Sequence, residues 1–453
     1  MPNNIDSTTQ KFLDIYEKLG SDKSKRFDEF IKIYGVNFNL YKNNEFIEQA
    51  FPFDIIPRII EKDDFATIEK GVKQRVFALN AFLNDIYSEA KIVKDGVIPS
   101  DFVYASKAFL PKFVGFEPLK GIRTHIGGID FVREAKSGKW IILEDNLRVP
   151  SGASYPLSIR KVYRKAYPEM FKEFSVVETD NYPKKLKEMA EFVSPGGIQA
   201  VLTPGRYNSA FYEHSYLAGK MGVPLCENDD LSAQDSKLYF KHFDGKLRRV
   251  GAVYRRLDDD FLDPVEFNKT SVIGVPNIVG AYMNKETAII NAIGNGVADD
   301  KGLYYFVPKM IEYYMGEKAI LENAPTYLPF YEKDRKFVLE NMSKLVIKDV
   351  AEAGGYGVVF GNKLSSSQLE ELSNIIKSEP RRFIAQEVVE FEDLPCFLDG
   401  KVAMRKADLR VFAVYGKDIF VMPGGLTRYS TIEGNYIVNS SQGGGFKDTW
   451  VLK

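Results

Sequence analysis

The sequence is poor in the residues that build several common kinds of site. It contains only two cysteines among 453 residues, Cys226 and Cys396, which are too few and too far apart for a disulfide framework or a zinc ribbon. Its three histidines leave little material for a histidine-based metal site. With 61 basic and 62 acidic side chains the net charge is −1, so overall charge favours neither nucleic acid nor an anionic membrane surface as a partner.

Long apolar runs are also absent. No window approaches the roughly 18 consecutive apolar residues of a membrane span, and the N-terminal sequence MPNNIDSTTQ lacks the basic start and apolar core of a signal peptide. With so few cysteines, a reducing cytoplasm is the simplest location. The 45% of apolar and 27% of charged residues are ordinary for a soluble globular protein, and the length allows two or three domains.

The residues that are present divide the chain into four regions. Residues 1–115 are predicted to be mainly helical, because apolar residues recur at helical spacing, as in TTQKFLDIYEKLG. Residues 116–165 favour strand, turn and strand, with the turn in KSGK. Residues 180–275 alternate strand and helix, and residues 276–453 combine helices, strands and glycine-rich connections. No long linker or repeat separates these regions, so we expect them to pack as one body.

The first region with candidate chemistry is a strand end, IILEDNLRVPSGASY (141–155). Glu144 and Asn146 are two residues apart, so both side chains point to one face of a strand. A carboxylate and an amide oxygen suit Mg²⁺, and Asp130 on the hairpin partner could add a third oxygen. Arg148 and the serine–glycine turn behind it favour an anion nearby. The alternative is a strand end at the surface that simply becomes polar.

The second candidate is the glycine-rich stretch VIKDVAEAGGYGVVFG (346–361). Lys348 ends a β-branched run shortly before Gly354, Gly355 and Gly357. Backbone N–H groups of such a loop can close over phosphates because no Cβ intervenes, and a lysine can bind the same anion. The stretch matches neither common phosphate-loop motif, so an ordinary glycine hairpin is the alternative.

A third candidate is the lysine in GNGVADDKGLYYFVP (294–308). Lys301 follows Asp299 and Asp300 where a helix is expected to begin. Acidic residues are favourable at a helix N-terminus, so a solvated helix end would explain the same pattern. The lysine becomes informative only together with the other two stretches.

Together these stretches resemble the ATP-grasp fold. The resemblance consists of a lysine at a helix start, a lysine on a strand before a glycine loop, an acidic hinge strand AQEVVEF, and a metal set of Asp and Glu-x-Asn. Here the metal set precedes both lysines, which resembles the circularly permuted ATP-grasp family (type 2), relatives of glutathionylspermidine synthetase. The resemblance covers nearly the whole chain, through LEDNLRVPSGASY, LTPGRYNSAFYEH, YRRLDDDFLDP, GNGVADDKGLYYFVP and VNSSQGGGFKDTWVL.

The resemblance implies a mixed α+β and α/β fold with a helical N-terminal region and a Rossmann-like domain at 180–275. It implies that 116–165 is the metal-binding strand module and that 276–453 carries the ATP-binding residues. The implied activity is ATP-dependent ligation of a carboxylate to an amine through an acylphosphate, with release of ADP and phosphate. The implied cofactors are ATP and Mg²⁺.

The family also implies roles for single residues. Lys301 and Lys348 would reach the α- and β-phosphates, and Arg148 the γ-phosphate or the acylphosphate. The complete implied set is Asp130, Glu144 and Asn146 for metal, Lys301, Lys348, Gly354, Gly355, Gly357, Gln386 and Glu387 for ATP, and Arg148 and Arg123 for catalysis. Gln386 and Glu387 would lie along the adenine and ribose. Arg410 and Arg428 are further candidates without a firm role.

The expected partners are small-molecule or peptide substrates, one a carboxylate and one an amine, with no nucleic acid and no membrane. Whether the chain forms a homo-oligomer stays open, as does the identity of both substrates. The alternative function is a non-catalytic nucleotide-binding or scaffold protein on the same fold. The intact lysines, glycines and metal-ligand candidates favour the enzyme.

Overall fold

The computed structural model describes residues 5–42, 45–350, 357–398, 400–438 and 443–453. Within these residues, no helix combines the length and apolar character needed to cross a membrane. The α-helices are α1 (Ser7–Leu19), α2 (Ser21–Tyr34), α3 (Lys62–Ile86), α4 (Lys91–Lys94), α5 (Ser100–Tyr104), α6 (Ser154–Ala166), α7 (Met170–Glu173), α8 (Tyr182–Val193), α9 (Phe211–Met221), α10 (Asp259–Leu262), α11 (Ile278–Met283), α12 (Lys301–Tyr304), α13 (Val307–Met315), α14 (Glu332–Asn341) and α15 (Ser366–Ser378).

The strands are β1 (Asn37–Lys42), β2 (Glu45–Ala50), β3 (Phe53–Ile60), β4 (Ile126–Arg133), β5 (Trp140–Asn146), β6 (Ile198–Leu202), β7 (Leu225–Cys226), β8 (Leu231–Gln234), β9 (Lys237–Lys241), β10 (Leu247–Arg255), β11 (Ala288–Ile290), β12 (Glu322–Asn323), β13 (Thr326–Tyr327), β14 (Leu345–Asp349), β15 (Val358–Phe360), β16 (Phe383–Glu387), β17 (Asp393–Leu398), β18 (Lys401–Tyr415), β19 (Ile419–Val421), β20 (Leu426–Tyr429) and β21 (Gly445–Val451). Two 3₁₀ helices bear on the site, η4 (Asn295–Asp299) and η7 (Pro380–Arg382).

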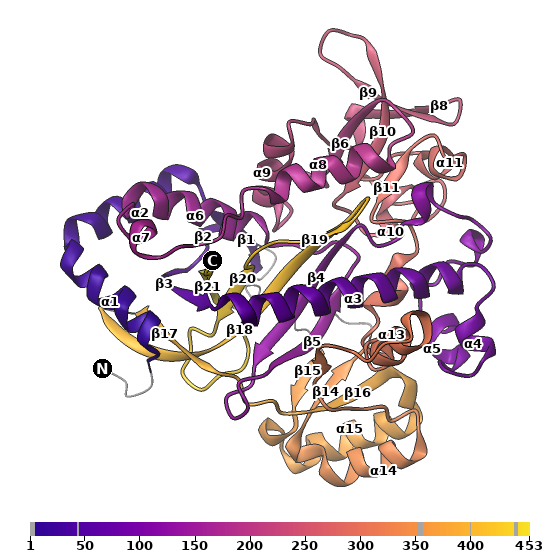
Figure 1. Ribbon diagram of the computed structural model, residues 1–453. Coiled ribbons are helices and arrows are strands. Elements are labelled where there is room, and N and C mark those ends of the chain that lie inside the picture. Colours follow the sequence, from indigo (N-terminus) through magenta and orange to yellow (C-terminus); the bar gives the residue numbers. More distant parts are fainter. Residues whose placement is uncertain (1–4, 43–44, 351–356, 399, 439–442) are drawn as a thin grey trace.

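The largest sheet joins strands from both ends of the chain (Figure 1). Its order is β12-β5-β4-β18-β20-β21-β3, and β17 and β19 also pair with β18. Strand β21 near the C-terminus pairs in parallel with β3 near the N-terminus. The hairpin expected in 116–165 is confirmed, because β4 and β5 pair antiparallel and its turn contains Gly138 with φ +69°.

Alternation of side chains along β4 gives the sheet two different faces. Ile129 and Phe131 are fully buried and belong to one apolar cluster with Ile68 and Val72 of α3, the long helix that crosses this face. Fully burying each such side chain stabilises the fold by about 1.5–3 kcal/mol. Asp130, between them, therefore points to the opposite face. The apolar side chains of β4 pack the sheet against α3, and the carboxylate of Asp130 points away from that helix.

The N-terminal region is less helical than the sequence pattern predicts. Helices α1 to α5 are present, but β1, β2 and β3 also lie within it. Strand β3 is buried along most of its length. A short apolar run such as FPFDIIPRII (51–60) cannot be assigned to helix or strand by periodicity alone, which is why the pattern does not reveal this strand.

A second sheet forms the Rossmann-like part of the molecule. Its order is β7-β6-β10-β9-β8, with β11 paired to the other edge of β10. Strands β7, β6, β10 and β11 run parallel, while β8 and β9 form an antiparallel extension. The sheet continues past residue 275, since β11 follows α11 in sequence.

The third sheet, β13-β16-β14-β15, is covered on one face by α14 and α15. Leu345 and Ile347 of β14 pack in one apolar cluster with Val338 of α14 and Ile376 of α15. Because strand residues alternate, Lys348 of β14 lies on the other face of the sheet. That face is turned toward the largest sheet, with the candidate site between the two (Figure 1).

Candidate nucleotide and phosphate site

A cavity of about 120 Å³ lies between the third sheet and the face of the largest sheet opposite α3. Many of the side chains that the sequence singles out line it. They come from six strands or helices and are Asp130, Glu144, Lys301, Lys348, Gln386, Glu387 and Arg428. Residues far apart in the sequence are therefore brought together in one place.

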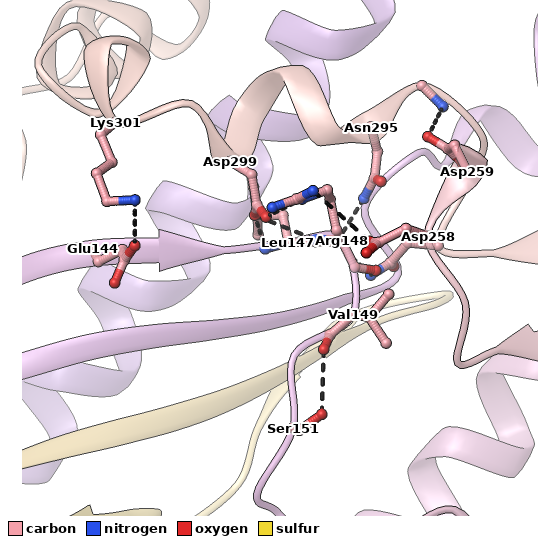
Figure 2. Close-up of polar contacts among 12 residues, drawn as sticks. Glu144, Leu147, Arg148, Val149, Ser151, Asp258, Asp259, Asn295, Asp299 and Lys301 are labelled. Carbon is pink, nitrogen blue, oxygen red and sulfur yellow. Dashed lines mark hydrogen bonds and ion pairs between the residues drawn. The ribbon is translucent and has the colours of Figure 1, made fainter. Parts of the chain in front are cut away.

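Two lysines converge on one carboxylate in this cavity. Lys301, the first residue of α12, places its Nζ 3.4 Å from Oε1 of Glu144 (Figure 2). Asp300 caps that helix, since its carboxylate accepts the N–H of Gly302 at 2.7 Å. Burial lowers the pKa of Lys348 to about 8; nearby Glu144 raises this pKa, and Lys301 lowers it further. Two cations close enough to perturb each other are stabilised when a polyanion lies between them.

Asp130 lies directly opposite Glu144 in the β4–β5 ladder. Arg410 donates two hydrogen bonds to its carboxylate at 2.6 and 2.7 Å, and Arg428 donates one at 2.9 Å. Burial raises the pKa of Asp130, but the two guanidiniums outweigh burial and bring that pKa down to about 2. The carboxylate therefore stays ionised. Three hydrogen bonds fill three of its roughly four lone-pair directions, which leaves one on Oδ1.

The donor set fits a hard cation in its chemistry. Asn146 is paired with Gly128, two positions along the ladder from the Asp130–Glu144 pair, so all three oxygen-bearing side chains belong to one face. Two carboxylates and an amide are ligands that Mg²⁺ accepts, usually with water and substrate phosphate completing the shell. Among the described residues, no group of three or more His, Cys, Asp or Glu side chains is arranged to hold a metal, so any metal here would depend on Asn146 and on the substrate.

The other end of the cavity is less charged. Gln386 is buried and donates to Oγ1 of Thr326 at 3.1 Å, and Glu387 accepts a hydrogen bond from the hydroxyl of Tyr327 at 2.6 Å. Phe360 lines the same end. Of the predicted glycines, Gly357 lies just before β15 with φ +70°, while Gly354 and Gly355 lie outside the described residues.

Arg148 lies beyond the end of β5 on a second, larger cleft. This cleft has a volume of about 970 Å³ and is lined by Asp258, Asp299 and Arg381 as well as Arg148. Asp299 raises the pKa of Arg148 through a close ion pair, so that guanidinium is always charged. A gap of about 10 Å³, lined by Glu144, Asp299, Lys301 and Lys348, lies between the cavity and the cleft.

The loop after β5 is held by a buried ion pair. Glu213 of α9 accepts hydrogen bonds from the backbone N–H groups of Gly152 at 2.7 Å and Ser154 at 3.0 Å. Arg256 contacts Glu213 at 3.1 Å and donates to the carbonyl of Pro150 at 3.0 Å. Gly152 has φ +119°, and a Cβ there would lie 2.6 Å from Leu426. Glycine is favoured at this turn because L side chains rarely adopt this φ, and a Cβ would also press on the Leu426 side chain.

Arg123, a predicted catalytic residue, lies apart from this group and lines neither cavity. It is buried, with its Nε donating to Asn84 at 3.0 Å and its guanidinium 4.6 Å from the ring centre of Tyr87. Burial lowers its pKa. These contacts stabilise the fold around α3 and give no sign of a role at the phosphate site.

Two buried residues that hold the β4–β5 hairpin in place, Arg75 and Asn291, were not predicted from the sequence. Arg75 of α3 binds Asp145 of β5 through two hydrogen bonds of 2.6 Å. Asn291 accepts from the backbone N–H groups of His125 and Ile126 and donates to the carbonyl of Leu147. The alternation of β5 could have predicted that Asp145 faces inward, opposite to Glu144. A single asparagine such as Asn291 carries no signal in one sequence.

Comparison with known proteins gives a family and a fold. The family model described as circularly permuted ATP-grasp type 2 matches residues 57–430. An uncharacterized protein of Synechocystis is 46% identical over 424 residues, covering 92% of this chain and 88% of that protein. An uncharacterized protein of Mycobacterium tuberculosis is 43% identical, covering 92% of this chain and 76% of its own.

Two further matches bear on activity and fold. A Frankia casuarinae protein named as a candidate glutamate–cysteine ligase is 38% identical over 96% of this chain, which spans 50% of that protein. Among solved structures, a glutathione synthetase-like effector of Globodera pallida in its apo form has a TM-score of 0.59 at 12% identity. That match covers 95% of this chain and 96% of the other. At so low an identity, this likeness shows the fold alone.

Proposed function

The chain belongs to the circularly permuted ATP-grasp type 2 family, and on that premise we propose that it is an ATP-dependent carboxylate–amine ligase. The observation that carries the proposal is the meeting of Lys301 and Lys348 beside Glu144 in a cavity between two sheets. Two cations held beside a carboxylate are better explained by a bound polyphosphate than by packing.

The residues of the cavity suggest how a nucleotide would lie. Lys301 and Lys348 would bind the α- and β-phosphates, and Gln386 and Glu387 would contact the adenine and ribose at the less charged end. Asp130, Glu144 and Asn146 would hold Mg²⁺, which supplies positive charge between neighbouring phosphates when bound. The described glycine, Gly357, and the two glycines before it would cover the phosphates.

The proposed reaction transfers the γ-phosphoryl group to a substrate carboxylate. The carboxylate oxygen attacks phosphorus, the bond to the β-phosphate oxygen breaks, and ADP leaves. The nitrogen of the amine then attacks the acylphosphate carbonyl and displaces phosphate, with loss of one proton. Charge spreads over the transferred group during the first step, so the protein's task is to neutralise it with fixed cations. Arg148 would be one of these cations: it lines the large cleft beside Asp299, which also lines the gap between the cleft and the cavity.

We propose the same division of labour for the four regions of the chain. Region 116–165 supplies the metal-binding strands, 276–453 supplies the nucleotide site, and 180–275 with 1–115 supports them. The name of the Frankia relative, a candidate glutamate–cysteine ligase, supports a small or peptide acid and an amine as substrates. The identity of both stays to be found by screening.

Two measurements test the proposal in turn. A ligand at 100 times its Kd adds about 2.7 kcal/mol of stability, so Mg-ATP should raise the melting temperature measurably. Acids and amines, including amino acids, short peptides and polyamines, are then screened in pairs, and the nucleotide products are separated by chromatography. ADP with an equal amount of amide supports the ligase. AMP would overturn the acylphosphate route, and binding without consumption would favour a non-catalytic nucleotide-binding protein.

A further inference from the structure

The carboxylate of Asp299 accepts three hydrogen bonds from two neighbouring residues, Leu147 and Arg148. Asp299 ends η4, two residues before Lys301, and its Oδ1 accepts the backbone N–H of Leu147 as well as that of Arg148 at 3.3 Å. Its Oδ2 accepts Nε of Arg148 at 2.7 Å (Figure 2). One side chain therefore fixes both the backbone that leaves β5 and the guanidinium attached to it. A guanidinium held at its Nε edge can rotate little, because the planar group is anchored close to its stem.

This grip leaves the outer part of the guanidinium available. Nη1 is 3.8 Å from Asp258, a distance too long for a hydrogen bond. Nη2 has no hydrogen-bond partner among the described residues. The side chain of Arg148 is 33% exposed, against 15% for Asp299. The arginine is thus anchored on its buried side and open toward the large cleft.

The neighbours of Asp299 contact other parts of the site. Asp300 binds Arg381 of η7 at 2.8 Å, which ties the third sheet to the main body. Lys301 reaches Glu144 inside the cavity. Three consecutive side chains therefore contact three separate partners, and only Asp299 touches Arg148. Asp299 lines both the gap and the large cleft, so the guanidinium that it holds is available to a γ-phosphate that extends from the cavity toward the cleft.

We propose that Asp299 is a positioning residue that holds Arg148 in the orientation needed to bind the γ-phosphoryl group. This inference rests on the proposed function, since it assigns Arg148 to that group. It also predicts whether removal of the Asp299 carboxylate strengthens or weakens binding of the triphosphate. Removing a carboxylate near a phosphate site should by itself tighten anion binding, because a repulsive charge is lost. Loss of positioning should do the opposite and weaken contact with the γ-phosphate alone.

The test compares a Mg²⁺-bound non-hydrolysable ATP analogue with Mg-ADP by calorimetry, so that no substrate needs to be known. The preference for the triphosphate over ADP isolates the γ-phosphate. In Asp299→Asn we expect this preference to fall about tenfold, the loss of one charge-assisted hydrogen bond, while ADP affinity is unchanged. Arg148→Ala should lower the preference similarly, and the double variant should lose no more than Arg148→Ala alone. Asp260→Asn removes the same charge from the same cleft without touching Arg148, and is the matched control.

Each other result overturns the inference. A triphosphate preference in Asp299→Asn that equals or exceeds that of the wild type would show that Asp299 acts only through its charge or not at all. Equal weakening of ADP and the triphosphate would show a merely structural role, and so would additive losses in the double variant. If Asp299→Asn does not fold, Asp299→Glu takes its place: its longer side chain displaces the guanidinium, and an unchanged preference would refute positioning.

The outcome also separates this inference from the proposed function. Wild-type protein that binds both nucleotides without preferring the triphosphate would refute the role of Asp299 and Arg148 but keep the nucleotide site. Wild-type protein that binds neither nucleotide would overturn the proposed function and this role with it.

Discussion

Lys348 offers a test in which stability and binding should change in opposite directions. The change is Lys348→Met, which keeps most of the side-chain volume and removes the cation. Burial lowers the pKa of Lys348 from 10.5 to about 8, and at about 1.4 kcal/mol per pKa unit this corresponds to about 3 kcal/mol against the charged form. This net shift already includes the attraction to Glu144, so we expect the variant to be more stable by up to about 3 kcal/mol at pH 7.

Nucleotide binding, in contrast, should become weaker in this variant. A hydrogen bond to a charged group contributes about 1.5–3 kcal/mol, so nucleotide affinity should fall about tenfold to hundredfold. The stability gain should also depend on pH. Because the pKa of the folded protein lies below that of the unfolded chain, the penalty is complete below pH 8 and is lost as pH rises from about 8 toward 10.5.

Urea denaturation and calorimetry with a non-hydrolysable ATP analogue measure the two effects. Lys344→Met is the matched control, since Lys344 is exposed one residue before the same strand; neither stability nor affinity should change there. An unchanged Kd in Lys348→Met, or a loss of stability with no loss of affinity, would refute the reasoning. The lysine would then be a structural cation rather than a phosphate ligand.

Three further predictions concern the metal side, the support of β5 and the response to acid. Glu144→Gln and Asn146→Ala should each abolish Mg²⁺-dependent turnover with little change in melting temperature; wild-type phosphate release in either would remove that residue from the metal set. Arg75→Met should cost about 3–5 kcal/mol in urea denaturation because it strands a buried carboxylate, and a cost near zero would mean that the pair is not buried in solution. Burial lowers the pKa of His125 from 6.5 to about 3. Because the unfolded chain then takes up a proton that the folded protein does not, this histidine should lower the free energy of unfolding by about 2 kcal/mol between pH 7 and pH 5. A His125→Gln variant with the same pH slope as the wild type would contradict that assignment.

The faces on which Glu144, Asn146 and Lys348 lie could be predicted from sequence because strand periodicity is a strong local rule. Glu144 and Asn146 share a face for the same reason that Asp145 lies on the other. The same alternation along β14 places Lys348 on the face away from the helices, since its neighbour Ile347 is buried against them. Nothing in this pattern requires knowledge of the rest of the chain.

What could not be predicted depends on contacts between distant segments. The surroundings of Arg123 are set by Asn84 of α3 and by Tyr87 just after that helix. Asn291 bonds backbone groups at both ends of the β4–β5 hairpin, more than 140 residues earlier in the sequence. The hydrogen bonds from Arg410 and Arg428 to Asp130 likewise form only when β18 pairs with β4 and β20 pairs with β18. Propensity and spacing carry no information about such pairs.

The position of β21 has a consequence for the order in which the protein can be made and folded. Residues 445–451 lie between β20 and β3, in parallel register with a strand near the other end of the chain. During synthesis, β3 and the helices packed on it leave the ribosome long before β21 is made. The edge of β3 that pairs with β21 therefore stays unpaired until residues 445–451 have been synthesised. Contacts of such long sequence separation fold slowly and leave apolar edges exposed in the meantime. Chaperone dependence during synthesis should therefore be greatest for chains arrested just short of residue 445.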